Sequence, residues 1–261
     1  MSGQARLRAA VAGRRALIPY VTAGDPDLAT TDALLAALTR GGADVIELGI
    51  PFTDPMADGP ILQAAAQRAL KNPFSLDAIL ELAATHHARG GPPIVLFGYV
   101  NPFFRYGFER LAERAAACGV AGVLCVDLPP EEAEPLVTAL DAYGLALIPL
   151  LTPTSTPDRI ARVREVTRAF AYYVSVTGVT GRALEDSELE SIATAAGEVQ
   201  TALGAPLVIG FGVRTPKDVA VLGRHVAGVV VGSALVELAH RASPESRAAE
   251  AEAYVRSLRA G

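Results

Sequence analysis

Short apolar runs rich in β-branched residues alternate with longer stretches of helical periodicity, and this alternation continues from about residue 16 to residue 259. The apolar runs predict eight strands, at residues 16–20, 43–48, 94–97, 122–126, 146–150, 171–175, 206–209 and 228–231. Several of these runs are apolar throughout rather than alternating, which is typical of parallel strands that are buried on both faces.

Amphipathic stretches between the strands predict crossover helices, at residues 28–40, 76–89, 108–118, 131–143, 157–166, 189–203 and 215–222, and a last helix at 243–258. Eight βα units of about 30 residues account for the chain length, so we predict an α/β fold, a closed (β/α)8 TIM barrel, rather than an open doubly wound sheet. We expect one domain, residues 1–261, with residues 5–11 forming an extra N-terminal helix across the N-terminal mouth of the barrel.

Composition and charge exclude several classes of protein. Hydrophobic residues make up 51% of the chain and charged residues 20%, which excludes a disordered chain. The 23 basic and 28 acidic side chains give a net charge of -5 without like-charge blocks, which argues against a nucleic-acid or membrane partner. The chain has no long apolar run or signal peptide, and its two cysteines, Cys118 and Cys125, form no disulfide framework, so we expect a cytoplasmic protein.

The second predicted strand contains a carboxylate, Glu47, in an otherwise apolar run. Val45, Glu47 and Gly49 share one face of this strand, so Glu47 points into the barrel mouth if that face lines the interior. Partial burial raises the pKa of a carboxyl group and gives it a proton to hold or deliver near neutral pH.

The loop after this strand, residues 50–60, contains three prolines and two more carboxylates, Asp54 and Asp58. A sheltered Glu47 together with a more mobile Asp58 is suited to general acid-base chemistry. The alternative is that Asp58 only caps the next helix and that Glu47 pairs with a basic side chain. Asp54 precedes Pro55 and is either a turn residue or a functional contact.

Glycine-rich turns follow the last three predicted strands, at residues 176–181, 210–213 and 232–233. Barrels often bind phosphate with the loops after strands seven and eight and with a helix N-terminus, because glycine exposes backbone N–H groups to the anion. These glycines therefore predict a small phosphate-binding site, although glycine in tight turns alone also explains them.

Other chemistries have little support. The four histidines lack metal-ligand spacing, so we expect no metal. No G-x-S-x-G elbow is present, and neither lysine, Lys71 or Lys217, lies at a predicted strand end where a Schiff base would form.

The chain resembles the tryptophan synthase alpha subunit family along nearly its whole length. The most specific segment is residues 47–63, ELGIPFTDPMADGPILQ, which is similar to the family's signature around its catalytic Glu and Asp. Further similar segments follow in order, at residues 19–26, 99–102, 126–129, 175–181, 210–212 and 232–233.

The resemblance implies cleavage of indole-3-glycerol phosphate to indole and glyceraldehyde 3-phosphate, a retro-aldol carbon-carbon lyase reaction in tryptophan biosynthesis, without a cofactor in this chain. It assigns the main acid-base role to Glu47, and it assigns to Asp58 a hydrogen bond from the indole N–H. Tyr172 would lie near Glu47, and Thr180 would orient Asp58.

The remaining site residues are also implied by the resemblance. The phosphate would be held by Gly181, Gly212, Gly232 and Ser233. The indole wall would consist of Tyr20, Phe97, Tyr99, Leu124, Leu151 and Phe211. Tyr20 and Phe97 depart from the commonest family residues and would reshape the wall slightly.

The family further implies a partner, a beta subunit that carries pyridoxal phosphate and receives indole in an alpha2-beta2 tetramer. Loops at residues 54–63 and 176–182 would close the site and carry signals between the subunits. Three alternatives remain: a stand-alone indole-3-glycerol phosphate lyase, a phosphate-binding isomerase with Glu47 as its single base, and an idle barrel that activates the beta subunit.

Overall fold

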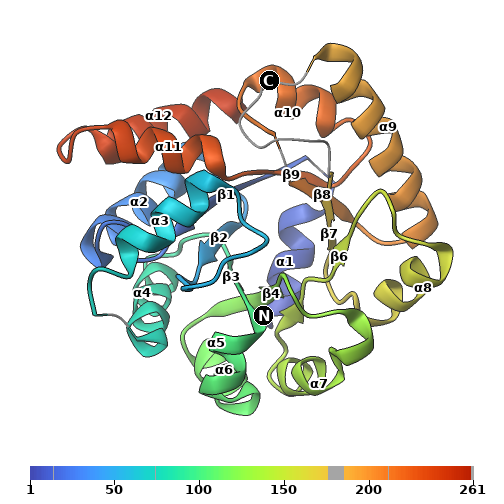
Figure 1. Ribbon diagram of the computed structural model, residues 1–261, viewed down its shortest axis with the longest axis horizontal. Helices are drawn as coiled ribbons and strands as arrows, with labels where there is room; N and C mark the ends of the chain where they lie inside the picture. Colours follow the sequence, from blue (N-terminus) through green and yellow to red (C-terminus); the bar gives the residue numbers. More distant parts are fainter. Residues whose placement is uncertain (14, 74, 176–184, 211, 260–261) are drawn as a thin grey trace.

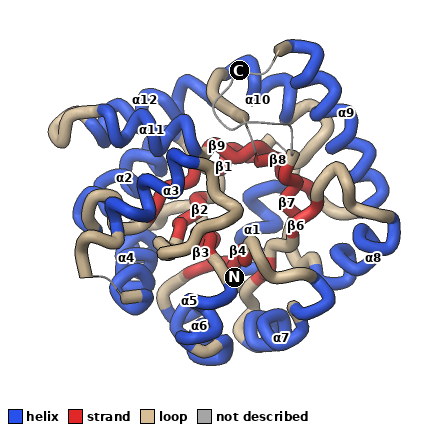
Figure 2. Tube along the Cα trace, in the orientation of Figure 1, coloured by secondary structure: helices blue, strands red, loops and turns tan. Residues whose placement is uncertain are grey.

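A computed structural model describes residues 1–261 apart from 14, 74, 176–184, 211 and 260–261. A ring of parallel strands lies at the centre and helices surround it (Figures 1 and 2). The strands are β1 (Ala16–Thr22), β2 (Ile46–Gly49), β3 (Ile94–Gly98), β4 (Val120–Cys125), β5 (Ala146–Leu147), β6 (Leu150–Leu151), β7 (Ala171–Val174), β8 (Leu207–Gly210) and β9 (Gly228–Val231).

The ring closes through β5 and β6, which are two halves of one strand. The hydrogen-bonded order is β5-β4-β3-β2-β1-β9-β8-β7-β6, so the open ends of this order are joined by residues 148 and 149 alone. The Ile148 N–H donates to the carbonyl of Val123, and the carbonyl of Pro149 accepts from the N–H of Tyr172, both at 2.9 Å. Pro149 has no N–H, which interrupts the ladder locally. The predicted eight-stranded barrel is therefore confirmed.

Helices cover the outside of the ring (Figure 2). These helices are α2 (Leu28–Gly41), α3 (Pro60–Ala69), α4 (Leu76–Ala88), α5 (Val100–Tyr106), α6 (Phe108–Ala117), the 3-10 turn η1 (Pro130–Glu132), α7 (Glu134–Ala142), α8 (Pro157–Val166), α9 (Asp186–Leu203), α10 (Pro216–Leu222), α11 (Ser233–Arg241) and α12 (Arg247–Arg259). Helix α1 (Gly3–Val11) lies across one end of the ring instead. The short helices α5 and α11 were not among the predicted ones, and α3 begins at Pro60, where a helix was expected directly after Asp58. None of the described helices is long and apolar enough to span a membrane.

Side-chain alternation along the strands divides the core into two layers. Val45 and Ile18 belong to a cluster inside the ring, whereas Ile46 and Leu48 pack outward against the helices. The face shared by Val45 and Glu47 is therefore the inner face, as the alternation predicts.

Helix α1 closes the N-terminal end of the barrel. Leu7 is fully buried in the inner cluster, and the Arg6 guanidinium donates to the carbonyls of Gly119 and Val120, at the start of β4. Gly3 lies so close to Ala121 that a Cβ there would come within 2.6 Å of its carbonyl oxygen. The predicted extra helix is thus present and covers the N-terminal mouth of the barrel.

Candidate active site

A cavity of about 740 Å³ occupies the C-terminal mouth of the barrel. Its wall contains Glu47 from β2, Tyr172 from β7 and Asp58 from the loop before α3. In a barrel of this type the loops after the strands carry the functional groups, so the cavity lies where a site is expected. The two carboxylates that the sequence singled out thus face the same space.

Glu47 is almost completely buried, with 2% of its surface exposed. Burial raises the pKa of its carboxyl group to about 8, because the charged form loses its hydration. No side chain in the described ranges forms an ion pair with this carboxyl, so pairing with a basic residue does not explain its burial. A proton is held at this position at neutral pH.

Asp58 lies at the end of the loop that leads into α3 and is partly buried. Burial raises the pKa of its carboxyl group to about 6, and a hydrogen bond from the Tyr99 hydroxyl partly opposes this rise. The N-cap of α3 is Gly59, without a side-chain cap, so helix capping by Asp58 is also excluded. At neutral pH Asp58 is mostly ionised while Glu47 is mostly protonated.

Tyr99 contacts both ends of the loop that carries Asp58. Its hydroxyl accepts a hydrogen bond from the backbone N–H of Ala57 at 3.0 Å, next to Asp58. The ring also packs against Phe52 at the other end of the loop, with ring centroids 5.3 Å apart. Asp54, by contrast, is exposed, and its carboxylate accepts from the Thr53 hydroxyl, as a turn residue would.

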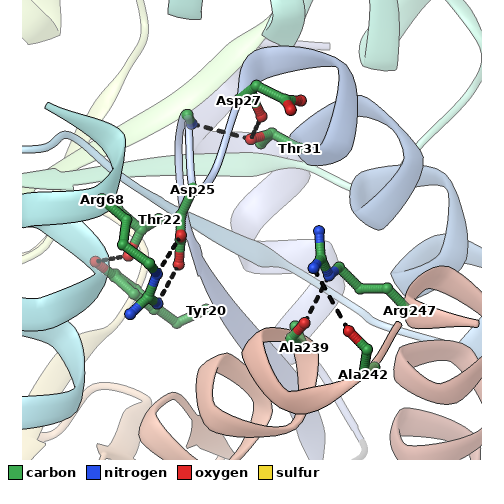
Figure 3. Close-up of polar contacts among 10 residues, drawn as sticks. Tyr20, Thr22, Asp25, Asp27, Thr31, Arg68, Ala239, Ala242 and Arg247 are labelled. Carbon is green, nitrogen blue, oxygen red and sulfur yellow. Dashed lines mark hydrogen bonds and ion pairs between the residues drawn. The ribbon is translucent and has the colours of Figure 1, made fainter. Parts of the chain in front are cut away.

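Tyr20 and Tyr172 line the cavity, and each ring occupies the space beside a glycine that has no side chain. A Cβ on Gly49 would lie 2.1 Å from the Tyr20 Oη, and one on Gly210 would lie 1.7 Å from the Tyr172 Oη. The Tyr20 ring meets Phe97 edge-on, with centroids 5.3 Å apart, and its hydroxyl contacts the Thr22 Oγ1 at 3.3 Å (Figure 3). Burial raises the pKa of the Tyr172 hydroxyl, and the nearby charges of Glu47 and Asp58 raise it further.

The N-terminus of α11 faces the cavity. Gly232 precedes this helix without a side-chain cap, and Ser233 and Ala234 line the cavity. The first backbone N–H groups of a helix have no intrahelical partners, and the helix dipole favours an anion beside them. This end of α11 is suited to a phosphate group.

The structure brings together most of the residues that the sequence singled out. The cavity wall includes Tyr20, Glu47, Asp58, Phe97, Tyr172, Gly212, Gly232 and Ser233. Tyr99 lies directly behind the wall, against Ala57 and Asp58. Thr180, Gly181 and Phe211, and the whole predicted loop at residues 176–182, lie outside the described residues.

Two expected wall residues lie elsewhere. Leu124 is fully buried in the inner cluster and does not line the cavity. Leu151 packs in the outer layer against the helices, and its neighbour Leu150 lines the cavity instead. Ala146 and Ile148 belong to the inner cluster and Leu150 packs against it, whereas Leu151 belongs to the outer cluster, which corrects the placement of Leu151.

Polar residues on the rim were not anticipated from the sequence. Thr152, Ser155 and Arg159 line the cavity beside β6 and α8, and Arg159 forms an ion pair with Glu131. These residues belong to a loop and a helix surface that carry no motif, so only the three-dimensional fold identifies them. In the described part of the chain, no group of three or more His, Cys, Asp or Glu residues is arranged to hold a metal ion.

Comparisons with known proteins agree with this geometry. The sequence profile described as "Tryptophan synthase alpha chain" matches residues 7–260. The chain belongs to the tryptophan synthase alpha chain family. The family predicted from the sequence is thereby confirmed, together with its place among the lyases of tryptophan biosynthesis.

Individual relatives span nearly the same length. The tryptophan synthase alpha chain of Citrifermentans bemidjiense is 53% identical over 225 residues, which cover 86% of this chain and 84% of the relative. That of Chromobacterium violaceum is 43% identical over 261 residues, which cover 100% and 99%.

Solved structures of the family have the same fold. The alpha subunit of Legionella pneumophila superposes with a TM-score of 0.91 at 32% identity, covering 100% of this chain and 98% of that one. A chain of the tryptophan synthase complex from Pyrococcus furiosus superposes with a TM-score of 0.83 at 33% identity, covering 94% and 98%.

Proposed function

We propose that the chain is the alpha subunit of a tryptophan synthase and cleaves indole-3-glycerol phosphate to indole and glyceraldehyde 3-phosphate. The observation that carries this proposal is that the buried Glu47 carboxyl and the Asp58 carboxyl line one cavity, together with the uncapped N-terminus of α11. A substrate with an aromatic N–H at one end and a phosphate at the other matches both ends of this cavity.

In this proposal Glu47 acts first as an acid and then as a base. Its buried carboxyl delivers a proton to C3 of the indole ring, and the resulting carboxylate takes the proton of the glycerol hydroxyl as the bond between ring and side chain breaks. The electrons of that bond return to the ring, the hydroxyl carbon becomes the aldehyde of glyceraldehyde 3-phosphate, and Glu47 ends protonated as it began. Its pKa of about 8 suits both roles near neutral pH.

Asp58 stabilises the charge that develops on the ring. Protonation at C3 makes the indole nitrogen more positive, and an ionised carboxylate that accepts its N–H hydrogen bond is most effective at that stage. Because Tyr99 and Ala57 hold the end of the loop, the Asp58 carboxylate is kept at the wall before substrate binds. The aromatic edges of Tyr20 and Phe97 give the ring an apolar surface.

The phosphate is assigned to the glycine-rich side of the mouth. Backbone N–H groups at the start of α11 lie beside Gly232 and Ser233, and Gly212 lies on the same wall. We assign Gly181, Thr180 and Phe211 to the site by resemblance alone. We also infer that residues 1–261 act as a single domain, because one ring of strands encloses one inner core.

The partner in this proposal is a beta subunit that holds pyridoxal phosphate and takes up the indole, in an alpha2-beta2 tetramer. Solved relatives include a tryptophan synthase complex from Pyrococcus furiosus, which supports an assembly of this kind. This chain supplies binding and proton transfer only, and the pyridoxal phosphate chemistry belongs to the partner.

The test is product analysis of indole-3-glycerol phosphate incubated with the purified chain, with and without the beta subunit. We expect indole and glyceraldehyde 3-phosphate in equal amounts, and faster release with the partner. Equally fast release without a partner identifies a stand-alone lyase. A rearranged phosphate ester without indole identifies an isomerase, and no reaction of the folded chain in either arm overturns the lyase proposal.

A further inference from the structure

Helix α3 carries the loop that ends in Asp58. It begins at Pro60, two residues after Asp58, and no side chain caps its N-terminus. Its buried residues are three alanines, Ala65, Ala66 and Ala69, and the larger Ile61 and Leu62 are partly buried against the cluster that contains Tyr20. Polar contacts near both ends of the helix add to this apolar packing and fix the position and direction of the helix.

Arg68, near the end of α3, forms a two-pronged ion pair with Asp25 (Figure 3). The guanidinium Nε donates to one carboxylate oxygen at 2.7 Å, and Nη2 donates to the other at 2.6 Å. Only 20% of the Arg68 side chain and 12% of the Asp25 side chain are exposed. A sheltered pair with this parallel geometry fixes both position and orientation, unlike a solvated single contact.

Two further contacts act along the same helix. The Asn72 amide, just after α3, donates to the carbonyl of Pro26 at 2.7 Å, so the loop after β1 holds the helix end at two points. At the other end, the Gln63 amide donates to the carbonyl of Asp58 at 2.8 Å and approaches that of Pro55 at 3.5 Å. Gln63 and Arg68 are five residues apart, about 7.5 Å along the axis.

The end of β1 also supports the cavity wall. Tyr20 and Ala65 lie in one apolar cluster, so α3 packs directly behind this wall residue. The Tyr20 hydroxyl contacts Thr22, and Asp25 follows three residues later. The same segment therefore sets both the aromatic wall and the anchor for α3.

We propose that Arg68, held by Asp25, and Gln63 are positioning residues that act through α3 to hold the Asp58 carboxylate at the cavity wall. Neither lines the cavity. This inference rests on the proposed function for its kinetic consequences. Loss of either contact lets the Asp58 loop move away from the reacting ring, and a displacement of about 1 Å in a catalytic group can cost as much as a hundredfold in rate.

The chain offers a matched control pair, Arg89 and Asp32. The Arg89 guanidinium also reaches both carboxylate oxygens, each at 2.9 Å, and joins α2 to the residue after α4. It does not line the cavity, and its side chain is 55% exposed. Arg89→Gln therefore removes an arginine–carboxylate ion pair, which Nη1 alone makes here, without touching α3.

The experiment compares Arg68→Gln, Gln63→Leu and Arg89→Gln in the alpha-beta complex. We expect kcat for indole release to fall about 10- to 100-fold in Arg68→Gln and about 10-fold in Gln63→Leu, with KM changed less than about threefold. Arg89→Gln should match the unaltered chain. The proposal is overturned if kcat falls equally in Arg68→Gln and Arg89→Gln. It is also overturned if kcat falls in neither Arg68→Gln nor Gln63→Leu.

A double-mutant cycle with Asp58→Asn separates positioning from a general loss of structure. If Arg68 acts through Asp58, Arg68→Gln should cost less than about twofold when Asp58→Asn is already present. An undiminished cost in that background overturns the proposal. Gln63→Leu in the same cycle keeps the test decisive if Arg68→Gln does not fold.

Carboxyl NMR titration of Asp58 gives a readout that does not need activity. A loop freed from α3 exposes the carboxyl to water, so Arg68→Gln should lower the pKa of Asp58 from about 6 towards about 3.9. An unchanged pKa contradicts the positioning role. If the unaltered chain releases no indole, the proposed function fails, while this titration still decides whether Arg68 positions Asp58.

Discussion

Tyr172 occupies the space that a side chain on Gly210 would need. A Cβ on Gly210 would lie 1.7 Å from the Tyr172 Oη and 2.1 Å from its Cζ. Gly210→Ala must therefore push the ring towards the cavity and Glu47. We expect kcat/KM for indole release to fall at least about tenfold, with a loss of about 1–3 kcal/mol in stability.

Replacing the ring tests whether the clash is the cause. In Tyr172→Leu the space beside Gly210 opens, so adding Gly210→Ala to that variant should cost little further stability. Thermal unfolding of the four proteins in this cycle gives the coupling energy. Equal costs of Gly210→Ala in both backgrounds would show that the ring is not what excludes a side chain.

The two carboxylates predict a bell-shaped pH dependence of kcat/KM. Below about pH 6 Asp58 becomes protonated and no longer accepts the indole N–H, and above about pH 8 Glu47 loses the proton it must deliver. The maximum of kcat/KM should lie between these two values. The two limbs of the profile report apparent pKa values that belong to the pair of carboxyl groups. Asp58→Asn should remove the acid limb from the residual activity. A rate that rises steadily to pH 9 would mean that Glu47 is needed ionised.

Burial of Glu47 should reduce stability at high pH. Its pKa is about 8 in the folded chain and about 4.3 when exposed, so the folded state binds more protons between these values. Stability therefore falls as pH rises from about 4.3 to about 8 and is constant above. Glu47→Gln should raise the unfolding free energy by a few kcal/mol at pH 9, because each tenfold change in proton affinity is worth about 1.4 kcal/mol.

Chemical denaturation of Glu47→Gln at pH 5 and pH 9 checks this linkage. The gain should be small at pH 5, where Glu47 is protonated in the folded chain. Substitution of the exposed Glu113 by Gln should change stability by less than about 0.5 kcal/mol at either pH. A loss of stability in Glu47→Gln at pH 9 would mean that the charged carboxylate has a stabilising contact.

The start of α11 predicts a charge effect on substrate binding. Ser233→Asp places a carboxylate where the phosphate is proposed to bind, so KM should rise at least about tenfold. The helix dipole stabilises an acidic residue in the first turn, so the free energy of unfolding should be unchanged or rise by about 0.3–1 kcal/mol. Ser75→Asp, at the N-cap of α4, is the matched control and should leave KM unchanged. An unchanged KM in Ser233→Asp would place the phosphate elsewhere.

Most of the fold and the central pair could be predicted from the sequence because each rests on local periodicity. The strand alternation through Val45 placed Glu47 on the inner face, and the apolar runs gave all eight barrel strands. A helix was expected directly after Asp58, but the extent of α3 was not, because its fully buried residues are small alanines. The fifth strand shows the limit of resemblance, since Leu150 rather than Leu151 faces the cavity.

Polar contacts between residues far apart in the chain could not be predicted from sequence patterns. Asp25 and Arg68 are 43 residues apart, and nothing in either segment marks them as partners. The rim residues Thr152 and Arg159 likewise meet the cavity only because β6 and α8 adjoin it. Tertiary structure alone brings such residues to one place.

The most direct measurement is the rate of indole release from indole-3-glycerol phosphate at pH 7 by the alpha-beta complex containing the unaltered chain, Glu47→Gln or Asp58→Asn. Because general acid-base groups typically contribute about 10²- to 10⁴-fold, we expect losses of this order in each variant, with both proteins still folded. Glu47→Gln activity within about tenfold of the unaltered chain would contradict the assignment of proton transfer to the buried carboxyl.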